Sequence, residues 1–250
     1  MNISYITCSD PRPDVPIEQL IKLLEISPLV ELGIQASPAN MSNDMPKYKW
    51  MDELIKISEN SAKPLNIAIH ANYQWCDSFC NGSIPNELLF WFYSQNKITS
   101  LPTIKRWQLN IGDNTKFFNA NSISQIIKNF PDREFIFPYN NKPSVVGSIK
   151  KLNKTGAKFS LLYDASYGRG KNPTNWQAPA FSFLKQGYSG GLSPENITQE
   201  LDRISAAVPG NQTIWIDAEG QLMKPGTREF DVQRADTYIN GALNWMDNQR

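Results

Sequence analysis

The turn Ser189-Gly190-Gly191, with the residues after it, is the stretch of the sequence best suited to holding a ligand. It follows a predicted short strand and precedes Ser193-Pro194-Glu195-Asn196, which we expect to open a helix with the Ser193 hydroxyl as its N-cap. Backbone N–H groups in such a turn face open space, and the start of a helix attracts negative charge. The turn is therefore a candidate anion seat, and an ordinary tight strand-to-helix turn is the alternative.

A thiol and a carboxyl group end two other predicted strands, Cys8 after residues 3–7 and Asp164 after residues 159–163. Together they permit a thiolate to remove a proton next to a carbonyl or imine while a protonated carboxyl donates to oxygen. This requires the positive ends of helices and the amides of the seat to favour the thiolate, and apolar burial to keep the acid protonated. Taken singly, a strand cysteine is more often a small core residue, and a strand aspartate is often a cap or an ion-pair partner.

Further polar residues are predicted at the same rim of strand ends, where packing alone does not explain them. They are Gln35, His70, Asn110, Ser189, Asp217 and Glu219, the last followed by Gly220. His70 alone is more often structural than catalytic. With Cys76 and Cys80 it would offer a metal only three ligands at unsuitable spacing, so we expect no metal site.

The elements that must position these residues alternate along the chain. Hydrophobic periodicity predicts strands over 3–8, 30–35, 65–71, 106–110, 134–138, 159–164 and 213–219, with a further short strand ending at Ser189. It predicts helices over 16–26, 48–61, 85–96, 122–129, 144–153, 197–207 and 232–246. Long loops are expected after the second strand (36–47), as a candidate lid, and after the third (72–84). We therefore predict an α/β fold, a single TIM-type (β/α)8 barrel domain over residues 1–250.

Composition limits the class of protein. The chain has 250 residues, 20% of them charged, and a formal net charge of +1, which argues against nucleic acid or a membrane surface as the main partner. No apolar run approaches the roughly 18 residues that span a bilayer, and the first residues lack the pattern of a signal peptide. Three cysteines, an odd number, favour a reducing compartment. We expect a cytoplasmic protein that binds a small molecule, and the oligomeric state is left open.

On these residues the chain resembles phosphoribosylanthranilate isomerase, a single-barrel enzyme of tryptophan biosynthesis. The resemblance rests on Cys8, on the strand and loop 161–176, and on the segment 189–196. It implies an Amadori rearrangement, which converts an aminoaldose phosphate into an aminoketose phosphate. In that reaction Cys8 would be the general base and Asp164 the general acid, and no cofactor would be needed.

The same resemblance implies which residues hold the substrate phosphate. They are Gly190 and Gly191, with the loop that contains Gly168, Gly170 and Lys171. In the family, an arginine after the second strand meets the anthranilate carboxylate, whereas this chain offers only Lys47 and Lys49 there. Asn110 stands where the family has histidine. Glu219 places a carboxylate beside the expected seat, next to Gly220. At about 4 Å in a partly buried site, two like charges repel by several kcal/mol.

A second resemblance is to barrel relatives that have a histidine at the end of the third strand. His70, the segment 106–110 and the segment 215–219 carry it. Three functional hypotheses follow. The first is an isomerase of the phosphoribosylanthranilate type or a divergent sugar-phosphate relative. The second is an enzyme that uses His70, Asp164, Asp217 and Glu219 on an unphosphorylated polyol or with a divalent metal. The third is a barrel that binds a ligand without catalysis.

Overall fold

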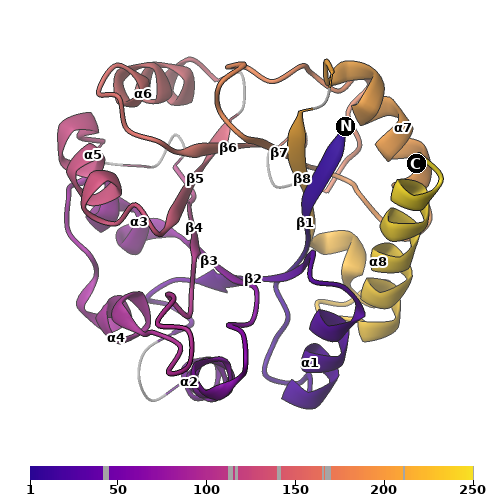
Figure 1. Ribbon diagram of the computed structural model, residues 1–250, viewed down its shortest axis with the longest axis horizontal. Coiled ribbons are helices and arrows are strands. Elements are labelled where there is room, and N and C mark those ends of the chain that lie inside the picture. Colours follow the sequence, from indigo (N-terminus) through magenta and orange to yellow (C-terminus); the bar gives the residue numbers. More distant parts are fainter. Residues whose placement is uncertain are drawn as a thin grey trace. The chain divides into compact units, whose positions relative to one another are not determined.

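Eight parallel strands form a closed barrel in the computed structural model, hydrogen-bonded in the order β1 to β8 (Figure 1). The structure describes residues 1–41, 45–111, 115, 118–139, 142–164, 166, 170–210 and 212–249. The prediction of a (β/α)8 TIM barrel is confirmed.

The strands match the predicted periodicity closely. They are β1 (Asn2–Ser9), β2 (Val30–Ala36), β3 (Ile67–Ala71), β4 (Arg106–Leu109), β5 (Glu134–Tyr139), β6 (Ser160–Asp164), β7 (Gln186–Ser189) and β8 (Thr213–Ala218). The α-helices are α1 (Ile17–Ile26), α2 (Pro46–Asn60), α3 (Tyr73–Cys80), α4 (Leu89–Tyr93), α5 (Ala120–Asn129), α6 (Pro143–Asn153), α7 (Ile197–Ala207) and α8 (Val232–Asp247). Two 3-10 helices, η1 (Asn86–Leu88) and η2 (Gly220–Leu222), complete the elements.

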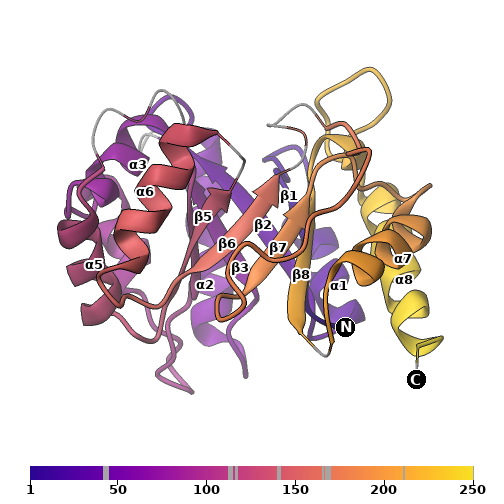
Figure 2. The same cartoon turned by 90° about the horizontal axis from the view of Figure 1, so that it is seen from above.

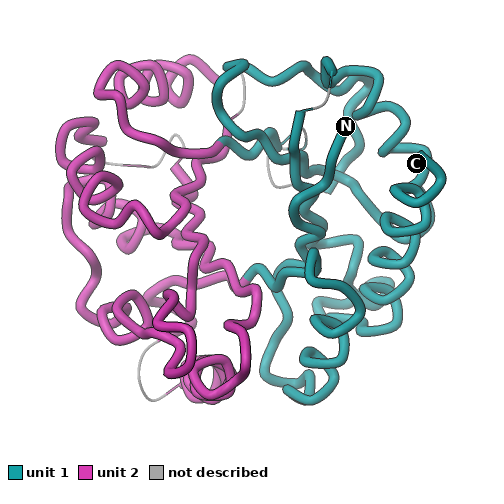
Figure 3. Tube along the Cα trace, viewed as in Figure 1, with its two compact units in different colours: residues 1–33, 161–250 teal, residues 34–160 magenta. Residues whose placement is uncertain are grey.

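The chain divides into two compact units (Figure 3). Unit 1 comprises Met1–Gly33 and Leu161–Arg250, and unit 2 comprises Ile34–Ser160. The long connections after β2 and β3 belong to unit 2, and those after β6, β7 and β8 belong to unit 1. The sequence predicts that residues 1–250 form one domain. Whether the two units together are that domain stays a prediction.

Unit 1 places helices α1, α7 and α8 along strands β1 and β8 (Figure 1). Asp231 starts α8, since its carboxylate accepts hydrogen bonds from the backbone N–H groups of Gln233 and Arg234. Trp215 of β8 lies flat against Gly187 of β7. A Cβ atom at position 187 would stand 2.1 Å from the indole ring. Glycine is required there because the ring fills the volume of a side chain.

Unit 2 has an aromatic core on one side of its strands, where helices α5 and α6 lie beside β5 (Figures 1 and 2). Phe92 of α4 contacts the rings of Trp107 and Phe135. At the first residues of β4 and β5, Arg106 Nε donates to Glu134 Oε2 at 3.0 Å. This ion pair of a buried arginine and a half-buried glutamate lies at the strand starts, away from the rim where ligands bind in barrels.

Three connections differ from their predicted form. The expected loop 72–84 contains helix α3, and the expected helix 85–96 is shorter and ends at Tyr93. The helix stops because Ser94 is tied elsewhere, with its hydroxyl 2.7 Å from both Glu59 and Thr103. Between β6 and β7 the described residues form no helix, although alternation predicts one. The segment 170–185 runs instead as turns and irregular chain.

Candidate functional site

A row of five polar residues crosses the strands of unit 1 at the same level. In register they are Asp164 (β6), Ser189 (β7), Asp217 (β8), Thr7 (β1) and Glu31 (β2). Carboxylates therefore alternate with hydroxyls along the row. Neighbouring strands lie about 4.8 Å apart, so Asp164 and Asp217 are separated by roughly two strand spacings.

Each carboxylate of the row accepts a hydrogen bond from a hydroxyl group, and Asp164 also accepts one from a backbone N–H. Ser9 Oγ donates to Asp217 Oδ1 at 2.6 Å, and Thr7 Oγ1 donates to Glu31 Oε1 at 2.8 Å. Asp164 Oδ1 accepts from both the N–H (2.9 Å) and the hydroxyl (2.8 Å) of Ser166. Asp217 is only 6% exposed and Glu31 only 1%. Asp164 is half-buried, which leaves it the most accessible acid of the row.

Cys8 lies on the other face of β1. Successive strand side chains alternate, and the neighbours of Cys8, Thr7 and Ser9, both bond to carboxylates of the row. The thiol is completely buried, and burial followed by the charge of Asp217 raises its pKa. Burial, followed by the nearby Cys8 and Asp217, also raises the pKa of the Tyr238 phenol in α8. The expected conditions for a thiolate are thus reversed, because burial opposes ionisation of Cys8.

The glycine turn after β7 has the open backbone that its sequence indicates. Gly190 and Gly191 adopt φ values of 110° and 74°, which side-chain-bearing residues rarely reach. Within the described part of the chain, the N–H groups of Gly191 and Leu192 have no acceptor. Gly191 and Leu192 are buried. Buried donors are normally paired, so these amides are suited to a bound anion.

The start of α7 differs from the predicted cap. The helix begins at Ile197, whose N–H bonds to the carbonyl of Ser193. Asn196 closes the turn instead of the Ser193 hydroxyl: its Oδ1 accepts from Ser193 N and its Nδ2 donates to the Gly191 carbonyl, both at 2.9 Å. Its side chain points back toward the glycines, so the turn keeps its shape without using their N–H groups.

Two further loops of unit 1 carry predicted seat residues. Gly170, at φ 62°, donates its N–H to Ser166 Oγ, which itself bonds to Asp164. The next residue, Lys171, is exposed. Gly168 lies outside the described residues. Glu219 and Gly220 follow β8 and are exposed, so water screens the carboxylate and reduces its repulsion of an anion at 4 Å to about 1 kcal/mol.

The rim of unit 2 is a chain of carboxamides that ends on His70. Gln108 donates to Asn110 (2.9 Å), Asn110 to Asn72 (2.8 Å), and Asn72 to Gln35 (2.8 Å). Gln35 Nε2 then lies 3.4 Å from His70 Nδ1. Three predicted rim residues, Gln35, His70 and Asn110, are therefore joined in unit 2. Sequence reasoning missed the central one, Asn72, although it directly follows a strand end.

His70 is neutral. Burial, followed by the charges of Arg106 and Lys47, lowers its pKa from 6.5 to about 3. Because each amide of the chain donates through nitrogen, the Gln35 nitrogen requires an acceptor at Nδ1. The proton of the neutral ring is then on Nε2. His70 is consequently a hydrogen-bond donor at Nε2 and no general base at ordinary pH.

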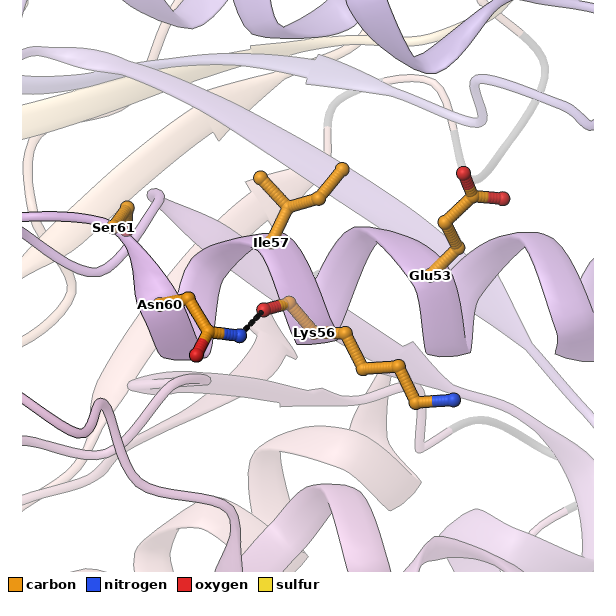
Figure 4. A pocket seen from close by; sticks show the side chains of 5 residues that line it. All are labelled: Glu53, Lys56, Ile57, Asn60 and Ser61. Atoms are coloured by element: carbon orange, nitrogen blue, oxygen red, sulfur yellow. Dashed lines mark hydrogen bonds between the residues drawn. The ribbon is translucent and has the colours of Figure 1, made fainter.

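Other features of the molecule do not form a second candidate site among the described residues. A shallow hollow lies along the exposed side of α2, lined by Glu53, Lys56, Ile57, Asn60 and Ser61 (Figure 4). Its Lys56 is paired with Asp52 at 2.6 Å. No group of three or more His, Cys, Asp or Glu side chains among the described residues is arranged to hold a metal ion. None of the helices in that part of the chain is both long and apolar enough to cross a membrane.

Comparison with known proteins supports the fold. A scan of protein-family models finds no match, and neither does a search of curated proteins. A crystal structure of monomers generated from dimeric phosphoribosylanthranilate isomerase of Thermotoga maritima aligns with 97% of this chain and 99% of that chain, with a TM-score of 0.50 and 12% identity. The 3-hexulose-6-phosphate synthase of Salmonella typhimurium aligns with 98% of this chain and 100% of its own, with a TM-score of 0.49 and 9% identity. The barrel is thus like that of the isomerase, in agreement with the resemblance of the sequence motifs.

Proposed function

We propose that this protein is an isomerase of a phosphorylated sugar, in which Asp164 and Asp217 move protons and the glycine turn holds the phosphate. The observation that carries the proposal is the row Asp164, Ser189 and Asp217, which continues beyond Ser189 into unpaired N–H groups at Gly191 and Leu192. Two carboxylates and an anion seat on adjacent strands suit a small anionic substrate.

The two carboxylates have different surroundings, which supports different roles. Asp217 is nearly buried and bonded to Ser9, and it would remove the proton from C2 of the open-chain sugar or its imine. Asp164 is more accessible and would donate its proton to the ring oxygen as the ring opens, and it would take up the proton of the C2 hydroxyl as the ketone forms. Asp217 would return the C2 proton to C1, and the proton from the C2 hydroxyl would restore Asp164, so both carboxyl groups end in their starting states and atoms and charge balance. A spacing of roughly 10 Å between their Cα atoms leaves room for a sugar carbon between the carboxyl groups.

Phosphoribosylanthranilate is the first substrate to test, because the sequence motifs and the barrel both resemble its isomerase. Loss of anthranilate fluorescence would be followed with the wild type and with the variants Asp217→Asn, Asp164→Asn and Cys8→Ser. We expect the wild type to turn the substrate over and each Asn variant to reduce this turnover about 1000-fold or more. Turnover by Cys8→Ser should stay within a few-fold of the wild type. Competitive inhibition by inorganic phosphate would support the seat.

The alternatives predict different results. Loss of turnover in Cys8→Ser, with Asp217→Asn active, would restore the thiol as the base. Phosphate binding without turnover of this or other aldose phosphates would indicate a binding protein. Activity on an unphosphorylated polyol that a chelator removes would indicate the metal-dependent enzyme.

A further inference from the structure

Glu200, in the first turn of α7, is a buried carboxylate that the proposed chemistry does not use. It is 3% exposed. Its oxygens accept hydrogen bonds from Trp176 Nε1 at 2.7 Å, Asn172 Nδ2 at 3.2 Å and Arg203 Nη1 at 2.8 Å. A buried charge is costly unless its environment supplies such partners, and here the positive end of the helix adds to them. Two of these donors come from the segment after β6.

That segment is held from several sides. Arg203, already bonded to Glu200, donates through Nη2 to the carbonyls of Pro173 (3.0 Å) and Thr174. Trp176 is buried and meets the rings of Tyr163 and Tyr188 edge-on. The described residues between β6 and β7 include no helix such as would normally follow β6, so Glu200 and Arg203 supply the attachment instead.

The attached segment touches the glycine turn directly. A Cβ atom added to Gly191 would lie 1.9 Å from Asn172 Oδ1 and 2.4 Å from Asn172 N. Asn172 thus occupies the place of a side chain at position 191, and Lys171 stands next to it in the chain. Any movement of residues 171–172 would alter the space above the turn.

We infer that Glu200 is a positioning residue, which fixes residues 171–176 against the Gly190–Gly191 turn and so forms the anion seat before the ligand arrives. This inference rests on the proposed phosphate site. A seat formed in advance binds more tightly because no loop has to be ordered on binding. Glu200 itself touches neither ligand nor reacting atoms in this scheme.

The test compares Glu200→Gln with a matched control on the same helix. Asp202 also accepts a hydrogen bond from an indole, Trp245 Nε1, at 2.7 Å, but on the side facing α8. Asp202→Asn therefore removes an equivalent bond without touching the segment 171–176. Two quantities are measured in each variant: the dissociation constant of inorganic phosphate by calorimetry, and amide hydrogen exchange over residues 170–176.

We expect Glu200→Gln to weaken phosphate binding about tenfold and to speed exchange in residues 170–176, with Asp202→Asn unchanged in both. The inference would be overturned if Glu200→Gln exchanged its amide hydrogens at the wild-type rate. It would also be overturned if the wild type bound phosphate and Glu200→Gln bound it with the same affinity. If the wild type binds no phosphate, the proposed seat fails, and exchange alone decides whether Glu200 holds the segment. Should Glu200→Gln not fold, Trp176→Phe keeps the ring and removes one donor. It must then show the same two changes at smaller size.

Discussion

The strand ends of unit 1 carry charge, whereas those of unit 2 carry neutral amides. In unit 1, Asp164, Asp217 and Glu31 stand in one row with hydroxyls between them. In unit 2, the carboxamides pass hydrogen bonds in one direction until they reach a neutral His70. Both arrangements satisfy buried polar groups, but the first places three carboxylates in one row, whereas the second contains only neutral groups.

Under the proposed function, this difference separates a region that carries the chemistry from one that gives rigidity. Like charges in a row destabilise the fold, and such a cost is typical of sites kept for function. The chain of amides stabilises the fold instead, because each amide donates a hydrogen bond to an acceptor on its neighbour. Removing one member would leave buried polar groups unpaired, at a cost in free energy of unfolding. Substitutions in unit 1 should therefore change activity more than stability, and those in unit 2 should do the reverse.

The largest expected effect is that of Asp217→Asn, which we predict to lower activity strongly without lowering stability. Turnover should fall about 1000-fold, while the free energy of unfolding stays the same or rises by up to about 1 kcal/mol as like-charge repulsion is relieved. Urea denaturation beside the turnover assay measures both. Glu229→Gln, in an exposed pair with Lys224, makes the same charge change as a control and should alter neither. A large loss of stability in Asp217→Asn would contradict the distinction.

Acid should weaken the fold through His70, the only histidine of the chain. The unfolded chain binds a proton near pH 6.5 and the native protein only near pH 3, so stability is full above 6.5 and is lost as pH falls between these values. We expect His70 to cost roughly 3 kcal/mol between pH 7.5 and pH 4. This loss is measured by denaturing the wild type and His70→Gln at several pH values across this range. If the free energy of unfolding fell equally steeply with pH in both proteins, His70 could not be neutral in the folded state.

Breaking the amide chain at its centre should be less costly. Asn72→Ala removes the hydrogen bonds that join Asn72 to Gln35 and Asn110, and we expect a loss of about 2 kcal/mol in the free energy of unfolding. Turnover per folded molecule should be retained. Asn121→Ala, at an exposed position of α5, is the matched control and should stay within about 0.5 kcal/mol. A loss of turnover without a loss of stability would assign a catalytic role to the amide chain.

The smallest effect concerns Glu195, a charge that lies outside the row. Its side chain is 61% exposed and pairs with Arg234, which lowers the pKa of Glu195 from 4.5 to about 2. The stabilisation is complete above pH 4.5 and lost as pH falls toward 2, and solvent screening holds it below about 1 kcal/mol. Glu195→Gln should therefore unfold at nearly the wild-type urea concentration at pH 7. A loss of several kcal/mol would mean that the pair matters as much as the buried row.

Local patterns predicted what depends on local structure. The barrel, Asp164 at a strand end and the glycine turn follow from periodicity and turn chemistry. The direction of Cys8 could not be predicted, because a shift of one residue exchanges the two faces of a strand and the pairing of β1 with β8 shifts between Ile3 and Tyr5. The role of Glu200 depends on donors far away in sequence, which no pattern within α7 indicates.

The contact between Gly187 and Trp215 bears on the order in which this barrel can change during evolution. The ring occupies the volume that a side chain at position 187 would need. Trp215 is 1% exposed, so its close-packed neighbours oppose a movement of the ring. Any residue larger than glycine at 187 becomes acceptable only after a smaller residue has replaced Trp215. Positions 187 and 215 therefore share one volume. A change from glycine and tryptophan to a larger residue at 187 and a smaller one at 215 has to begin with the replacement of Trp215.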